Sequence, residues 1–90
     1  MTRERLHEIV DLVMDASEII EDRHLYHNVE ISVGRYPEVR IRENIGCPND
    51  RVRTYYGYTP IWDTTGQNVD IVFDLAEKHL RELIERMKEE

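Results

Sequence analysis

The sequence contains few of the features that mark a secreted or membrane-embedded protein. Its single cysteine, Cys47, excludes an internal disulfide and gives no sign of a disulfide-rich secreted fold. Its uninterrupted apolar runs are two or three residues long, whereas a membrane-spanning helix needs about 20 apolar residues. No charged segment followed by an apolar run opens the chain, so no signal peptide is indicated. We therefore expect an intracellular, cytoplasmic protein that does not enter a membrane.

Motifs that bind nucleotides or support catalysis are also missing. The sequence has no GxGxxG, no Walker A run and no GxSxG. Cys47 lies in a predicted loop between Gly46 and Pro48, and nothing in the sequence brings a histidine close enough to activate its thiol. His24 and His27 could share a metal with nearby acids, but their spacing is not that of a complete zinc site. The sequence thus predicts no enzymatic activity, no cofactor and no metal.

Basic residues are outnumbered by acidic ones. The chain has 19 Asp and Glu against 12 Lys and Arg, which gives a formal charge of −7 at pH 7. This balance disfavours direct binding to DNA, RNA or an anionic membrane, because like charges repel. It is compatible with a basic protein surface as the partner. The 90 residues suffice for one domain, which we place at residues 1–90.

Two segments have the periodicity of amphipathic helices. In residues 3 to about 23, apolar side chains recur at intervals of three and four residues, which places them on one face. Residues 69 to about 88 repeat the pattern, with Asn68 as the capping residue and Asp70 in the first turn. The predicted buried faces consist of Leu6, Ile9, Val10, Val13, Ala16, Ser17 and Ile20 in the first helix, and of Val69, Val72, Phe73, Ala76, Leu80, Leu83, Ile84 and Met87 in the second.

Three short segments between these helices alternate in the manner of half-buried strands. Their alternating positions are Val29, Ile31 and Val33, then Val39 and Ile41, then Val52, Thr54, Tyr56 and Tyr58. The connections GRYP (34–37) and NIGCPND (44–50) are too short for a parallel crossover, so the strands form an antiparallel meander. The sequence therefore predicts an α+β fold, a two-layer αβββα domain with both helices on one face of a three-stranded sheet.

The same alternation predicts a sheet face rich in arginine. If the apolar positions face the core, the open face carries Arg40, Arg42, Arg51, Arg53 and Tyr55, with Glu30 and Glu38 on the same side. One interpretation is a solvated face whose charges keep the sheet soluble. The other is a recognition face for a nucleic acid or an acidic ligand, because Arg and Tyr are enriched at binding hot spots.

The first helix carries a stripe of acidic residues opposite its apolar face. The stripe residues Glu8, Asp11, Asp15, Glu18 and Asp22 follow Glu4 at intervals of three and four, with Arg5 the one base near their path. Like charges at this spacing weaken a helix. In the second helix, by contrast, acids and arginines alternate at i,i+4. The stripe is either a solvated face or a surface that imitates a run of phosphates and binds a basic groove.

Some apolar residues also allow a contact with a second chain. Ile71 and Leu75 lie on the polar side of the second helix. Trp62, in the predicted loop TPIWDTTGQ (59–67), closes the core or anchors an interface. An acidic helical layer and an arginine-bearing sheet are complementary, so a homodimer is also expected.

The predicted order of elements resembles that of the double-stranded-RNA-binding domain, over almost the whole chain. That family has a lysine-rich motif at the start of its second helix, whereas this chain has GQNVDIVFDLAEK there, with Asp70 and Asp74 in place of positive charge. The resemblance therefore implies the topology and not phosphate binding. In size and acidity the chain is also similar to small phage-encoded inhibitors of host defence, such as anti-CRISPR and anti-restriction proteins, which share no motif.

Together these features predict a small acidic protein-binding domain without enzymatic activity. It would act as an inhibitor that occupies the basic surface of a nucleic-acid-handling protein, in the host cytoplasm if a phage encodes it. The alternatives are a binding module that uses the Arg/Tyr sheet face, and a structural homo-oligomer.

Overall fold

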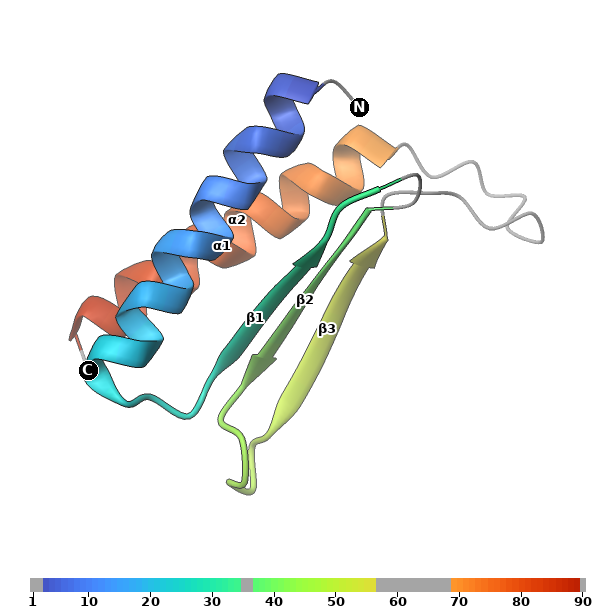
Figure 1. Cartoon of the computed structure of the whole chain (residues 1–90). Helices are drawn as coiled ribbons and strands as arrows, with labels where there is room; N and C mark the ends of the chain where they lie inside the picture. The colour runs from blue at the N-terminus through green and yellow to red at the C-terminus, as the bar shows by residue number, and fades with distance from the viewer. Residues whose placement is uncertain (1–2, 35–36, 57–68, 90) are drawn as a thin grey trace.

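The computed structural model describes residues 3–34, 37–56 and 69–89 of the chain, and it has the predicted order of elements (Figure 1). These are α1 (Arg3–Arg23), β1 (Asn28–Ser32), β2 (Glu38–Glu43), β3 (Arg51–Tyr56) and α2 (Val69–Glu89). Both helices lie on one face of the sheet, so the predicted two-layer α+β fold is confirmed. The predictions about Tyr58 and Trp62 concern positions outside the described residues.

The two helices run in the same direction, and side chains of α1 contact α2 near both ends. Near their starts, Nη1 of Arg5 on α1 lies 2.7 Å from a carboxylate oxygen of Glu77 on α2, and its Nη2 lies 2.5 Å from Asp74. At the far end, Nη1 of Arg23 donates hydrogen bonds of 3.0 Å to the backbone carbonyls of Met87 and Lys88. Arg23 therefore satisfies carbonyls in the last turn of α2, which have no partner within the helix.

The three strands form an antiparallel sheet in the order β1-β2-β3. In its register, Glu30 is paired with Arg40, Arg40 with Thr54, and Val39 with Tyr55. The central strand β2 alternates as the sequence predicts, with Val39 and Ile41 buried and Arg40 and Arg42 exposed. Glu30 and Glu38 share the open face with these arginines, as expected from their parity.

The core lies between the helix pair and one face of the sheet. It is built from residues of all five elements: Ile9, Leu12, Val13 and Ala16 of α1, Val29, Val39, Ile41 and Tyr55 of the strands, and Phe73, Ala76, Leu80, Leu83, Ile84 and Met87 of α2. Some positions differ from the prediction: Leu12 is buried although it was not expected to be, Ser17 is exposed, and Val33 lies beyond the end of β1 and is 63% exposed. Because α1 packs on both β1 and α2, its buried arc is wider than one row of side chains.

The predicted orientation of β3 is wrong, because the side chains expected to face the core face away from it, and the reverse. Arg51, Arg53 and Tyr55 lie on the helix side of the sheet, since they are paired with Glu43, Ile41 and Val39, whose side chains face the core. The open face instead carries Val52, Thr54 and Tyr56, and Val52 is 57% exposed.

The physical reason lies in the position of β3 at the edge of the sheet. α2 packs on this strand and Tyr55 is 8% exposed, but Arg51 and Arg53 on the same side remain exposed. Arginines can thus point to the helix side without losing their hydration. Alternation of charge with β-branched residues therefore did not identify the buried side here.

The loop between β2 and β3 is held by local hydrogen bonds. The backbone N–H of Cys47 donates to the carbonyl of Asn44, and that of Gly46 donates to a carboxylate oxygen of Asp50 at 3.2 Å. Asn44 and Gly46 have φ angles of 59° and 81°, a region that L side chains rarely adopt. The loop returns the chain so that β3 starts opposite the end of β2.

Neither described helix has an apolar stretch long enough to cross a membrane.

Candidate functional site

A buried carboxylate lies at the end of β2. Glu43 continues the inward positions of Val39 and Ile41, and it is 1% exposed. An isolated charge at such a depth would be expensive, so it needs charged or hydrogen-bonded partners. The sequence supplies these partners from two other elements, β3 and α2.

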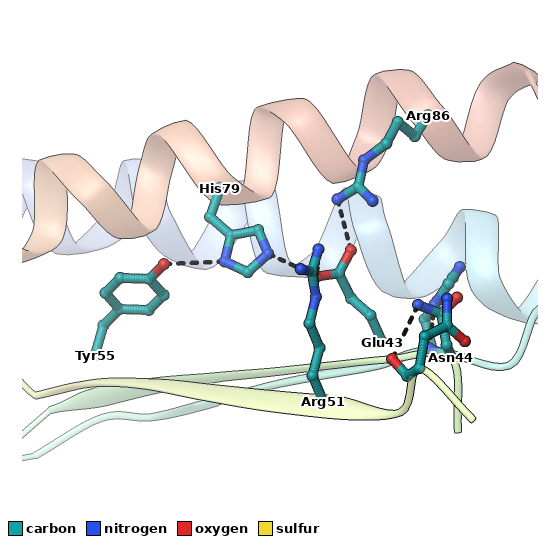
Figure 2. Close-up of polar contacts among 8 residues, drawn as sticks. Glu43, Asn44, Arg51, Tyr55, His79 and Arg86 are labelled. Atoms are coloured by element: carbon teal, nitrogen blue, oxygen red, sulfur yellow. Dashed lines mark hydrogen bonds and ion pairs between the residues drawn. The ribbon is translucent and has the colours of Figure 1, made fainter. Parts of the chain in front are cut away.

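The side chains of Arg51, His79 and Arg86 surround Glu43 (Figure 2). We call Glu43, these three residues and Tyr55 the Glu43 cluster. From α2, Nη2 of Arg86 donates to Oε1 at 2.5 Å. From β3, Nε of Arg51 donates to Oε2 at 3.1 Å, and its Nη2 lies 3.1 Å from the same oxygen. Nε2 of His79 on α2 is 3.0 Å from Oε2. The cluster therefore ties α2 to two strands.

His79 extends the cluster to Tyr55. Its Nδ1 lies 2.9 Å from the Tyr55 hydroxyl, and the two rings meet edge to face with centroids 5.9 Å apart. An ionised carboxylate only accepts hydrogen bonds, so Nε2 of His79 carries the proton toward Glu43. In the neutral imidazole Nδ1 then accepts the hydrogen bond from Tyr55.

The charge of Glu43 is set by two opposing effects. Burial alone would raise its pKa, but hydrogen bonds from His79 and Arg86 and the charge of Arg86 outweigh burial and lower it below the ordinary value. Glu43 is therefore ionised at neutral pH. The same series of hydrogen-bonded groups, a hydroxyl, an imidazole and a carboxylate, activates the nucleophile in many hydrolases. Here the carboxylate also binds two guanidiniums, and its hydrogen bond with Nε2 fixes the orientation of the His79 ring.

A half-open pocket of about 400 Å³ lies beside this cluster, between β3 and α2. Its described lining also includes Ile41, Val52 and Tyr55, of which Ile41 and Tyr55 are buried and Val52 has its side chain on the open face of the sheet. The guanidinium of Arg53 lies over the Tyr55 ring, with its carbon 5.3 Å from the ring centroid. The charged groups among its described lining residues are Arg51, Arg53, Arg86, Glu43 and Glu82.

The predicted acidic stripe follows the outer face of α1. Glu8, Asp11, Asp15, Glu18 and Asp22 are all exposed. Glu8 is paired with Arg5 at 3.0 Å. The other four carboxylates have no ion pair with any residue in the described part of the chain. Met14, which is 57% exposed, lies among them.

The predicted arginine face is divided between the two sides of the sheet. Arg40 and Arg42 remain on the open face, and Arg42 forms a two-pronged pair with Asp50, through Nε at 3.1 Å and Nη2 at 2.7 Å. The hydrogen bonds from Arg42 and from the Gly46 N–H lower the pKa of Asp50. Arg51, Arg53 and Tyr55 belong to the Glu43 cluster and its pocket on the other side, so the five residues do not form one surface.

The residues considered for a thiol or metal site are separate in the structure. Cys47 is exposed in the loop after β2. Nδ1 of His27 accepts a hydrogen bond of 3.2 Å from the backbone N–H of Asn44. Within residues 3–34, 37–56 and 69–89, no three His, Cys, Asp or Glu side chains are grouped to hold a metal ion.

Sequence reasoning did not identify the Glu43 cluster. One signal was present, because Glu43 shares the parity of Val39 and Ile41 and so points inward. His79 and Arg86 are seven residues apart on α2 and hence lie on one face. Nothing in the sequence, however, indicates that this face meets the end of β2.

Comparisons of the chain with protein-family models, with curated proteins and with solved structures found no match. We therefore infer its function from the charges and geometry described above.

Proposed function

We propose that this protein is a non-enzymatic binding domain whose α1 outer face occupies a basic surface on another protein. We call this face, formed by Asp11, Asp15, Glu18 and Asp22, the α1 acidic face. The observation that supports the proposal most is that these four exposed carboxylates have no basic partner among the described residues.

The distribution of arginines also supports this proposal. Some acids elsewhere in the domain have basic partners: Glu43 is bound by two arginines, Asp50 by Arg42, and Glu77 by both Arg5 and Arg81. Closely spaced like charges weaken a helix. A helix that keeps four unpaired carboxylates in one row is suited to a partner that supplies the opposite charge.

The spacing of the carboxylates suggests the kind of partner. A helix rises about 1.5 Å per residue, so carboxylates three or four residues apart are separated by roughly 5–6 Å along the axis. This is of the order of the phosphate spacing along a nucleic-acid strand. A groove that binds nucleic acid presents Lys and Arg to such a row of charges. We therefore propose that the domain inhibits a nucleic-acid-handling protein in the cytoplasm, as phage-encoded inhibitors of host defence do.

The alternatives are less well supported. An Arg/Tyr sheet face would have needed five residues on one surface, and the structure divides them. A homodimer formed by the acidic helix and the open sheet remains a prediction; the exposed basic residues of that sheet face are Arg40 and Arg42, of which Arg42 is paired with Asp50.

Paired charge-reversal variants test the proposal. The double variant Asp11→Lys/Asp15→Lys reverses the α1 acidic face. The matched control, Glu85→Lys/Glu89→Lys, makes the same change in net charge at exposed positions of α2. Each protein is immobilised and used to capture proteins from a lysate of the host cell.

We expect the wild type and the α2 control to retain the same basic protein, and the α1 variant to lose it. Recovery of the same proteins by both variants would show that the α1 acidic face is only a solvated surface. The thermal unfolding of each variant is measured first, because loss of capture is informative only for a folded domain.

A further inference from the structure

The pocket between β3 and α2 has features of a ligand site that is separate from the α1 acidic face. Its volume of about 400 Å³ is within the range of small-molecule sites, which is roughly 300–1,000 Å³. Most of its described lining residues are charged or polar. Figure 2 shows that Arg51, His79 and Arg86 approach this region from opposite elements, β3 below and α2 above.

Positive charge exceeds negative charge at this pocket, although the protein as a whole is acidic. Among its described lining residues, three arginines face two acids, Glu43 and Glu82. Glu43 is buried and already accepts from Arg86, Arg51 and His79. Its oxygens therefore do not compete strongly for further donors at the mouth of the pocket.

Several N–H donors of these arginines are not used within the described residues. Glu43 engages Nη2 of Arg86, and Nε and Nη2 of Arg51, which leaves other donors of both guanidiniums. Arg53 has no hydrogen bond or ion pair with the described part of the chain, and its guanidinium lies over the Tyr55 ring. Stacking on an aromatic ring holds a guanidinium in place while its N–H groups stay free along the edge.

We propose that this pocket binds a small molecule that carries an oxyanion, a phosphate or a carboxylate. The oxyanion accepts hydrogen bonds from Arg53 and from the unused donors of Arg51 and Arg86. Guanidiniums suit this role because their planar set of donors matches the oxygens of both groups.

The test is an NMR titration with three probes at constant pH and ionic strength: inorganic phosphate, phenyl phosphate and benzoate. The informative variant is Arg53→Gln, because Arg53 is exposed and does not hold Glu43. The matched control is Arg40→Gln, which removes the same charge from an exposed arginine on the opposite face of the sheet. Arg40→Gln removes no contact of the core, and Arg53→Gln removes the contact with the Tyr55 ring but keeps every hydrogen bond of Glu43.

We expect saturable shifts for residues of β3 and for His79 with inorganic phosphate, and with phenyl phosphate or benzoate. Arg53→Gln should lower the affinity about tenfold, as expected when a charge-assisted hydrogen bond is lost, while Arg40→Gln should leave it unchanged. Tighter binding of phenyl phosphate than of benzoate assigns the oxyanion as a phosphate, and the reverse order assigns it as a carboxylate. The proposal is wrong if none of the three probes gives saturable shifts, or if both variants lose affinity equally.

Discussion

Replacing Glu43 by glutamine is the most informative change to the interior of the domain. Glutamine has the same shape, but it keeps only one acceptor oxygen and turns a donor NH2 group toward Arg86 or toward Arg51 and His79. At least one charge-assisted hydrogen bond is therefore lost, which costs about 1.5–3 kcal/mol. The larger cost of an unpaired buried charge, about 3–5 kcal/mol, does not apply. The side chains of Arg51 and Arg86 are 66% and 49% exposed and can turn to water.

We therefore expect Glu43→Gln to lower the free energy of unfolding by about 2 kcal/mol. For a domain of this size, each kcal/mol corresponds to a change of about 4–8 °C in Tm, so Tm should fall by roughly 8–16 °C. Thermal unfolding followed by circular dichroism measures the change. The control is Glu21→Gln, an exposed position on α1, where a change within about 0.5 kcal/mol is expected.

The pH dependence of this difference follows from the lowered pKa of Glu43. In the unfolded chain the carboxyl titrates near its ordinary pKa of about 4.3. The ionised form is favoured in the folded state, so its contribution is complete above that pH and is lost as the pH falls through the folded pKa. The Tm values of the wild type and of Glu43→Gln should thus differ by a constant amount near neutral pH and converge in acid. Equal Tm values at pH 7 would refute a stabilising role for the Glu43 cluster.

Three further changes test the packing and the loop. Phe73→Ala should destabilise the domain by about 3–5 kcal/mol, because Phe73 is fully buried; urea unfolding measures it, and a loss below 1 kcal/mol would contradict the described core. Arg5→Ala should lower Tm by a few degrees, since Arg5 joins Asp74 and Glu77 to α1 at a partly exposed site. The loss should shrink at high salt, and an unchanged Tm at low salt would show that these ion pairs contribute nothing to stability. Gly46→Ala should lower the free energy of unfolding by about 1 kcal/mol, because the φ of 81° at Gly46 is unfavourable for alanine. No atom lies within 4 Å of the added carbon, so a Tm equal to that of the wild type would show that the loop relaxes.

The sequence predicted the architecture because its strongest patterns are local. The three- and four-residue spacing of both helices and the alternation in β2 each bury one face, and only a two-layer arrangement covers all of these faces together. Val39 and Ile41 show this directly, since both are essentially fully buried as expected.

The orientation of β3 could not be obtained in the same way. The segment RVRTYY has a large side chain at each parity, Tyr55 on one side and Tyr56 on the other. The choice depends on distant residues, because Glu43 is paired with Arg51, and Tyr55 reaches His79 on α2. A local pattern contains neither contact. The same limit explains why the Glu43 cluster and its pocket were not predicted.

The most direct test of the proposed function is the affinity of the purified partner, once the capture experiment identifies it. We expect Asp11→Lys/Asp15→Lys to weaken binding by about a hundredfold or more, because each reversed charge then faces a like charge in the interface. The control Glu85→Lys/Glu89→Lys should bind nearly as the wild type does, and wild-type association should slow as salt is raised above about 0.1 M, where exposed charges are screened beyond roughly 10 Å. Equal affinities for the two variants, or association that does not depend on salt, would contradict a role for the α1 acidic face in binding.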